Sequence, residues 1–215
     1  MNPGPPKWRR RKEARPAEIV EAALEVFAEK GFAAARLDDI AAAAGVSKGA
    51  LYLYFETKQD LFRAVVRQAI SPNLDAVEAA VMAADIPFDM LLRGFYARMT
   101  AILTTARVGA VAKMVIGESR NFPDLAKVWH DELVVRALGV LTAVIARAQA
   151  RGEVRPGDPR QHAFTVIGPV LLGVLWNETF TPVGAQPIDL AALVSQHADT
   201  VLTGLAVRQP KEAAP

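Results

Sequence analysis

Residues 38–58 contain two short helical segments joined by a glycine, and this spacing constrains the fold more than any other feature of the chain. Gly45 can adopt the positive φ angle that ends a helix over residues 38–44. The hydroxyl of Ser47 can cap a second helix, over about 48–54, by accepting a hydrogen bond from a backbone N–H group. Two short helices joined in this way form a helix-turn-helix, whose second helix fits the major groove of DNA.

A larger set of residues around this motif resembles a known family in order and spacing. Residues 17–67, about a quarter of the chain, resemble the DNA-binding domain of the TetR/AcrR family of bacterial transcriptional regulators. The resemblance implies a cytoplasmic regulator of transcription, typically a homodimeric repressor that a small molecule releases from a palindromic operator. The matching residues are Ile19–Leu24, Phe27, Gly31, Phe32, Asp39–Ala41, Ala44–Ser47, Leu51–Phe55, Lys58, Leu61 and Phe62.

Helical periodicity continues along the rest of the chain, and no alternating strand pattern appears. We therefore predict an all-α fold of about nine helices, in which a three-helix helix-turn-helix domain precedes a larger helical ligand-binding and dimerisation domain. Thr57 can cap the fourth helix, which is predicted to continue past a kink at Pro72 to about Ala84. The predicted segments are a basic disordered arm over 1–12, the DNA-binding domain over 13–73 with its helix-turn-helix motif over 36–55, and the C-terminal domain over 74–215.

The second helix of the motif carries side chains suited to contact with DNA. Lys48 can donate to guanine O6 and N7 or to a phosphate, and Tyr52 and Tyr54 can bond phosphates. Leu53 offers no hydrogen bond and can only touch a thymine methyl group. Lys58, at the start of the next helix, can hold a phosphate beside the helix dipole. The full candidate set for DNA binding is Arg36, Ser47, Lys48, Gly49, Tyr52, Leu53, Tyr54 and Lys58.

Arg36 departs from the family pattern. Family members usually have serine or threonine immediately before the second helix, where the hydroxyl caps the helix and touches a phosphate. Arginine cannot accept a hydrogen bond, so Asp38 and Asp39 in the positive first turn must favour this helix instead. Arg36 can still hold a phosphate through charge-assisted hydrogen bonds. Gly49 removes a side chain at a point where the backbone can approach the DNA.

Positive charge is concentrated at the N-terminal end of the chain. The whole protein has a net charge of +2, whereas residues 1–16 hold six basic residues and one acidic residue. A basic arm ahead of a helix-turn-helix can neutralise phosphates or enter the adjacent minor groove. The alternative is a disordered, solubilising tail.

Composition and apolar runs bear on the compartment. The chain has no cysteine, so it has no disulfide and no thiolate metal site, which suits a reducing cytoplasm. The first residues are charged but no apolar segment follows them, so a secretory signal is not predicted. The best membrane candidate, residues 163–176, contains Pro169 and is shorter than the roughly twenty residues that a spanning helix needs. We predict a soluble, cytoplasmic protein without a membrane partner.

Two C-terminal helices, predicted over about 160–179 and 188–207, are apolar on much more than one face. A helix that is apolar all round must be buried. We predict that the same pair of helices from a second subunit buries them in a four-helix bundle about a two-fold axis. Burial inside a single subunit is the alternative. The predicted interface residues are Phe164, Gly168, Leu172, Gly173, Leu190, Leu193, Val194 and Val201.

Aromatic residues and methionines in the C-terminal part are candidates for the lining of a ligand cavity. Side chains of this kind at helical spacing also occur in an ordinary core, so both interpretations stay open. The sequence does not identify the ligand, which we expect to be a lipophilic small molecule. The candidate pocket residues are Phe95, Tyr96, Met99, Met114, Trp129, Phe164, Trp176 and Asn177.

Two other classes of function compete with a ligand-responsive regulator. An enzyme is disfavoured because the three histidines, His130, His162 and His197, are far apart and fit no metal-binding or catalytic motif. No catalytic residue, metal site or cofactor is therefore predicted. A constitutive or architectural DNA-binding protein remains the alternative, although dimerisation alone would need far fewer residues than the C-terminal domain contains.

Overall fold

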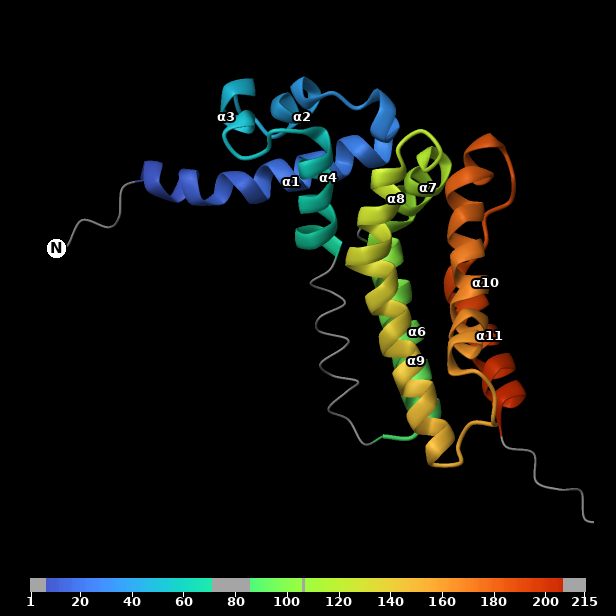
Figure 1. Ribbon diagram of the computed structural model, residues 1–215. Helices are drawn as coiled ribbons and strands as arrows, with labels where there is room; N and C mark the ends of the chain where they lie inside the picture. Colours follow the sequence, from blue (N-terminus) through green and yellow to red (C-terminus); the bar gives the residue numbers. More distant parts are fainter. Residues whose placement is uncertain (1–6, 71–85, 106, 207–215) are drawn as a thin grey trace, which may run out of the picture. The chain divides into compact units, whose positions relative to one another are not determined.

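The computed structural model describes residues 7–70, 86–105 and 107–206. The described chain is helical, with one isolated antiparallel bridge between Val154 and Ala206, so the all-α prediction is confirmed. Its helices are α1 (Lys7–Ala34), α2 (Leu37–Ala43), α3 (Lys48–Tyr52), α4 (Lys58–Val65) with the π-helical turn η1 (Val66–Ile70), α6 (Phe88–Thr105), α7 (Val108–Glu118), α8 (Pro123–Trp129), the π-helical turn η2 (His130–Val134), α9 (Val135–Ala150), α10 (Pro159–Thr179), the 3-10 turn η3 (Thr181–Val183) and α11 (Leu190–Leu205) (Figure 1).

The described residues group into two compact units. The first lies within residues 1–72 and 106–133, and the second within residues 73–105 and 134–215. Helices α7 and α8 therefore group with the N-terminal helices, although the sequence assigns all residues after 73 to the C-terminal domain. The physical reason is that α7 packs along α1 and its last residue, Glu118, accepts hydrogen bonds from the backbone in the last turn of α1.

Aromatic rings form the centre of the first unit. Here α1 packs against α2 and α4, and α2 packs against α3 (Figure 1). The ring of Phe32 lies 5.5 Å from that of Phe27 and 6.0 Å from that of Phe62, between ring centroids. Phe122, which precedes α8, adds a fourth ring 5.2 Å from Phe32. Leu51 of α3 is fully buried in the same unit, and α3 packs against α2.

Helix α1 begins earlier than predicted. Residues 7–12 are helical in the structure, where the sequence predicts part of a disordered arm. Lysine, arginine, glutamate and alanine are good helix formers, and together they extend the helix backwards from Pro16. Residues 1–6 of the predicted arm and residues 71–85 of the predicted fourth helix, with Pro72 and Ala84, lie outside the described residues.

Aliphatic packing forms the centre of the second unit. Helix α10 packs against both α9 and α11, and α11 packs against α6. The hydroxyl of Tyr96 lies inside this core and donates to the carbonyl oxygen of Val166 at 2.9 Å. Burial raises the pKa of Tyr96 above its usual range. The other buried residues include Leu92, Leu141, Ile145, Ala163, Val170 and Val201.

Two helical stretches, Pro123–Ala150 and Pro159–Val183, are long and apolar enough to cross a membrane by length and composition alone. The second is longer than the apolar run counted in the sequence, because α10 includes the residues on both sides of that run. One face of α10, which includes Val166 and Val170, is buried within the second unit.

Candidate nucleic-acid interface and ligand pocket

Helix α1 is kinked at Gly31, where the backbone leaves helical geometry. Gly31 has φ +76° and ψ 168°, a conformation that residues with a side chain rarely adopt. A Cβ atom built on Gly31 would lie 2.6 Å from Oε1 of Glu118. The glycine therefore allows both the sharp turn and the close approach of the Glu118 carboxylate.

Two opposite charges hold the turn that follows Gly31. The Glu118 carboxylate accepts hydrogen bonds from the N–H groups of Phe32 at 3.0 Å and Ala33 at 2.8 Å. The Lys58 ammonium donates to carbonyl oxygens on the same turn, at 3.3 Å to Ala33 and 2.9 Å to Ala35, and to that of Phe32. It also lies 4.4 Å from the centre of the Phe32 ring. Partial burial lowers the pKa of Lys58, and the nearby Glu118 carboxylate opposes this shift.

The sequence predicts that Lys58 contacts a phosphate, and in this structure its ammonium bonds to backbone carbonyl groups. Three carbonyl groups and a ring face already surround its ammonium, so Lys58 fixes the position of the backbone that leads into α2. The sequence did not indicate Glu118 as its counterpart, because the two residues are 60 positions apart. Only the fold brings these two charges to one turn.

The caps of α2, α3 and α4 follow the sequence prediction. Arg36 precedes α2 and makes no side-chain cap, while Asp38 and Asp39 occupy the first turn. Ser47 caps α3 by accepting from the N–H of Ala50 at 3.2 Å. Thr57 caps α4 in the same way, through the N–H of Asp60 at 3.0 Å.

Gly45 supplies the turn between α2 and α3 with a φ of +65°. Together with the cap at Ser47, this turn orients α3 relative to α2. Leu51 is the buried residue of α3. The helix-turn-helix predicted from the sequence is present.

The outer side of α3 carries most of the predicted DNA contacts. Leu53 is 82% exposed and Tyr52 is 44% exposed, and both follow Lys48 and Gly49, which are exposed as well. Arg36 and Ser47 are also exposed, whereas Tyr54 is half-buried. Six of the eight predicted residues are thus exposed in the helix-turn-helix.

Asp38, an acidic residue in the first turn of α2, also belongs to this surface. Nζ of Lys48 lies 2.8 Å from Oδ1 of Asp38. The hydrogen bond that Lys48 donates to the Asp38 carboxylate raises the pKa of Lys48, and the charge of Arg36 acts in the opposite direction. Arg36, Asp38 and Lys48 therefore form one charged group across α2 and α3.

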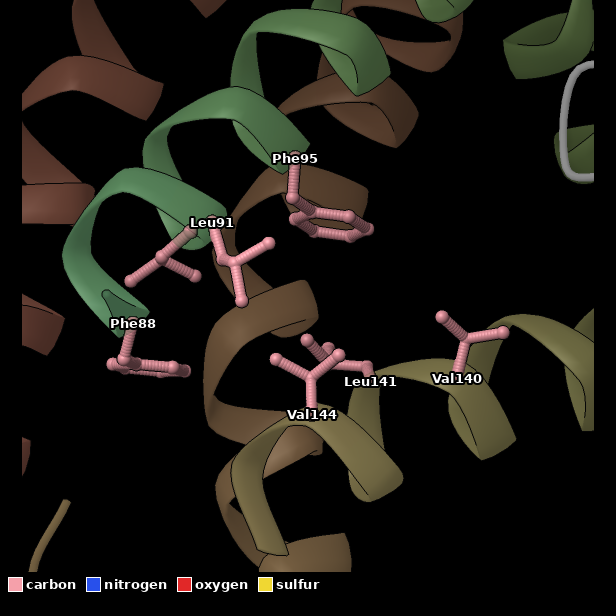
Figure 2. Close-up of a pocket in the computed structure, with 7 residues that line it drawn as sticks. Phe88, Leu91, Phe95, Val140, Leu141 and Val144 are labelled. Carbon is pink, nitrogen blue, oxygen red and sulfur yellow. The ribbon is translucent and has the colours of Figure 1, made fainter. Parts of the chain in front are cut away.

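An apolar pocket lies between α6 and α9 in the second unit, where side chains from the two helices point toward one another (Figure 2). It leaves about 20 Å³ for the centres of water-sized molecules, which is room for about one water. Its lining has no charged or amide side chain among the described residues. The lining residues are Phe88, Leu91, Leu92 and Phe95 of α6 and Val140, Leu141 and Val144 of α9.

Of the eight predicted pocket residues, only Phe95 lines this pocket. Met114 and Trp129 belong to α7 and α8 in the first unit, and Tyr96 is buried in the core of the second. Met99 packs against that core from its edge. The sequence could not separate pocket from core, because both use the same apolar residues at the same helical spacing.

The remaining predicted pocket residues lie on α10. Phe164 is half exposed. Trp176 donates through Nε1 to the carbonyl oxygen of Gln186 at 3.0 Å. Asn177 holds Ile188 from both sides, since its amide donates to the Ile188 carbonyl and accepts from the Ile188 N–H, each at 2.8 Å. Trp176 and Asn177 therefore fix the connection between α10 and α11.

The predicted interface residues fall into two groups. Leu172, which is 64% exposed, Phe164 and Gly168 lie on the outer side of α10. Val194 and Val201 instead are buried in the core of their own unit. Gly173 is also used internally, since a Cβ at that position would lie 2.7 Å from Leu193 and 2.9 Å from Leu190 of α11.

A helix-turn-helix built on an aromatic core, followed by a helical unit with an apolar pocket, defines the class of the protein. The first part of the chain, residues 19–65, matches the family model of bacterial regulatory proteins of the tetR family. Residues 91–194 match the model of the tetracyclin repressor-like C-terminal domain. The chain therefore belongs to the TetR family of transcriptional regulators.

Several relatives match along nearly the whole chain. The fatty acid metabolism regulator protein of Bacillus subtilis is 24% identical over 199 residues, which cover 90% of this chain and 98% of that protein. The transcriptional repressor BepR of Brucella suis is 28% identical over 207 residues, covering 91% of this chain and 96% of BepR.

Solved structures agree with the fold. A TetR-family regulator from Mesorhizobium loti has a TM-score of 0.74 at 25% identity, over 92% of this chain and 99% of that one. FadR of B. subtilis, solved with stearoyl-CoA, also scores 0.74, at 21% identity over 88% and 98% of the two chains. SmeT, solved with triclosan and described as the repressor of a multidrug efflux pump of Stenotrophomonas maltophilia, scores 0.71 at 23% identity over 94% and 99%.

Proposed function

We propose that this TetR-family regulator is a homodimeric repressor that binds a palindromic DNA operator and is released from it by a lipophilic small molecule. The observation that carries the proposal is the apolar pocket between α6 and α9, in a chain whose helix-turn-helix exposes Lys48 and Tyr52. We further propose that the protein acts in the cytoplasm and catalyses no reaction. The family is one of transcriptional regulators.

DNA is read by the exposed side of the helix-turn-helix. Lys48 faces base edges or phosphates, Tyr52 and Tyr54 bond phosphates, and Leu53 meets a thymine methyl group. Arg36 holds a phosphate from the start of α2. The remaining contacts come from Ser47 and from the backbone at Gly49. Lys58 contributes indirectly, because its bonds to the turn after Gly31 position α2.

Dimerisation covers the outer side of α10. Leu172 and Phe164 expose apolar surface there, and Trp176 and Phe180 add a ring pair with centroids 5.1 Å apart. Exposed apolar surface of this extent favours a protein partner. A two-fold dimer would place the same helix of a second copy on this surface and would present two recognition helices to the two halves of a palindrome.

The pocket indicates an apolar effector. Ligand pockets usually hold roughly 300–1,000 Å³, so a space of about 20 Å³ must widen before a drug-sized molecule enters. The bound molecules of two structural neighbours, stearoyl-CoA and triclosan, each have an apolar part, which is the acyl chain of the first and the aromatic rings of the second. An effector releases the DNA only if it binds the widened state better than the DNA-binding state.

The proposal is tested by measuring DNA binding in the presence of effector candidates. Genomic fragments that the protein retains are selected first, and their complexes are then titrated with stearoyl-CoA and with triclosan. Release by either compound supports the proposal. Selected DNA that no lipophilic compound releases would favour a constitutive DNA-binding protein instead.

Two variants on α9 test whether the effector that releases DNA binds in the pocket. Val140→Phe fills the space between α6 and α9, so it should prevent release while DNA binding persists. Val135→Phe is the matched control, because Val135 lies on the same helix, is 50% exposed and does not line the pocket. Equal effects of the two variants would contradict the assignment of the pocket.

A further inference from the structure

In this structure the ammonium of Lys48 is already bonded to a carboxylate of the same chain. Asp38 lies in the first turn of α2 and Lys48 in the first turn of α3, with 2.8 Å between Oδ1 and Nζ. The two side chains are 45% and 58% exposed. The pair thus spans the two helices of the motif on a part of the surface that DNA can reach.

A carboxylate at this place opposes general binding to DNA. Ionised aspartate only accepts hydrogen bonds, so it can make no bond to a phosphate, and the two negative charges repel. A lysine that donates to both Asp38 and a phosphate brings the two negative charges close together, which weakens the phosphate contact. The surface formed by Arg36, Asp38 and Lys48 therefore attracts DNA less strongly than its two basic residues alone would.

A G·C base pair can satisfy both members of the pair at once. Guanine presents O6 and N7 as acceptors in the major groove, and cytosine presents its N4 amino group as a donor. Lys48 can donate to guanine while Asp38 accepts from cytosine. A phosphate offers no donor to Asp38, and in an A·T pair of the same orientation the pyrimidine presents the acceptor O4 and a methyl group where cytosine presents its amino donor.

We propose that Asp38 is a specificity-determining residue, which withholds Lys48 from phosphates and lets it act at a G·C pair. The proposal rests on the proposed reading of DNA by α3. On this proposal Asp38 suppresses binding to unrelated DNA sequences, and it does so only when Lys48 is present.

The chain offers a matched control in the next residue. Asp39 lies in the same turn of α2 and forms a comparable pair with Lys30 of α1, at 3.0 Å, with a side chain 35% exposed. Asp39→Asn removes the same charge from the same turn but leaves the Lys48 pair intact. It therefore separates a general change in charge from a specific effect on Lys48.

The experiment is a double-mutant cycle on the full-length protein. Wild type, Asp38→Asn, Lys48→Met and the double variant are each bound to a library of duplexes with a random core. Affinity for the unselected library, its salt dependence and the sequences enriched by selection are all measured. Asp39→Asn is tested in the wild-type and Lys48→Met backgrounds.

We expect Asp38→Asn to tighten binding to the unselected library by about two- to fivefold, the range of an exposed ion pair. The slope of log affinity against log salt should steepen by up to about 0.9, as for one additional phosphate contact. Preference for a G·C pair should weaken at one position in each half-site. All three effects should disappear in the Lys48→Met background, whereas the effect of Asp39→Asn should be the same in both backgrounds.

Two results would overturn the inference and are distinguishable from each other. If Asp38→Asn tightens binding equally with and without Lys48, Asp38 is only a repulsive charge and has no role through Lys48. If wild type binds the library but enriches no sequence, the proposed reading of DNA fails, and this inference fails with it. Circular dichroism of each variant checks that the helices are retained.

Discussion

The turn that leads into α2 and the pocket between α6 and α9 are built from different kinds of contact. In the first unit, charged side chains bond to backbone groups, as Glu118 and Lys58 do at the turn after Gly31. In the second unit, aliphatic side chains pack around a pocket, and Tyr96 supplies a polar contact within the core. Hydrogen bonds fix direction, whereas apolar contacts are non-directional and can be exchanged for similar ones. The first arrangement suits a surface that must keep its shape, and the second suits a cavity that must widen.

The largest expected effect tests whether the apolar unit needs a partner. Leu172→Arg places a charge on the exposed side of α10, where the second copy would lie, and burial of an unpaired charge costs several kcal/mol. Self-association should weaken by at least about 100-fold, as measured by sedimentation, and binding to the selected DNA should be lost. Met90→Arg, at an exposed apolar position on α6, is the control and should leave self-association unchanged. A monomeric wild type at micromolar concentration would contradict the proposed dimer.

A smaller effect is expected at the polar turn of the first unit. Gly31→Ala forces a residue with a side chain into a positive φ and displaces the Glu118 carboxylate. The free energy of unfolding should therefore fall by about 2–4 kcal/mol. Urea unfolding, monitored by the circular dichroism of the helices, measures this loss of stability. Gly139→Ala in α9, where a Cβ meets nothing within 4 Å, should instead stabilise by about 0.5–1 kcal/mol. A neutral Gly31→Ala would show that the turn tolerates rearrangement.

The buried hydroxyl of the second unit is expected to matter less. Tyr96→Phe removes the bond to the carbonyl of Val166, which should cost about 1 kcal/mol. The loss stays at this low level because Nε2 of His197 lies 3.2 Å from the same oxygen. Thermal unfolding of the variant is compared with that of Tyr52→Phe, whose hydroxyl lies on the exposed side of α3 and whose loss should leave stability unchanged. A cost well above 3 kcal/mol would mean that directional bonds dominate in this unit too.

The smallest expected effect is a dependence of the first unit on pH. Arg67, through a hydrogen bond of 2.6 Å, holds the pKa of Glu132 below its ordinary value of 4.5. A carboxylate with a lowered pKa in the folded state stabilises the fold above the unfolded pKa, and this stabilisation is lost as pH falls through the folded pKa. Both side chains are partly exposed, so the loss should stay below about 1 kcal/mol.

Hydrogen exchange between pH 6 and pH 3 measures this loss, and Arg67→Gln should flatten it. Glu153 of the second unit also has a pKa below its usual value, because Arg151 and the N–H of Phe88 bond to its carboxylate. A loss of protection in acid is therefore expected at the ends of α6 and α9 as well, and Arg67→Gln should leave that loss unchanged. A loss in the first unit that Arg67→Gln does not alter would contradict its assignment to Glu132.

The sequence predicted those features that depend on local chemistry. The caps at Ser47 and Thr57 and the turn at Gly45 depend on neighbours a few positions away. Their residue types therefore indicate them directly.

The role of Lys58 and the pairing of Lys48 with Asp38 were not predicted, because each depends on groups brought together by the fold. Among the apolar residues, Phe95 was identified as a pocket residue, but Tyr96 beside it belongs to the core. Neighbouring positions on a helix face different directions, and their chemical type alone does not reveal which direction leads to a cavity.

The purely hydrocarbon lining of the pocket has a consequence for what such a regulator would report. An extra methylene contributes about 0.8 kcal/mol on burial, so successive members of a homologous series would differ only about fourfold in affinity. A wall without hydrogen-bonding groups also rejects an added hydroxyl only weakly. As far as the described residues line the pocket, dose–response curves for different hydrophobic compounds would overlap. Expression of the regulated genes would then follow the total concentration of hydrophobic compounds in the cell and not the concentration of one metabolite.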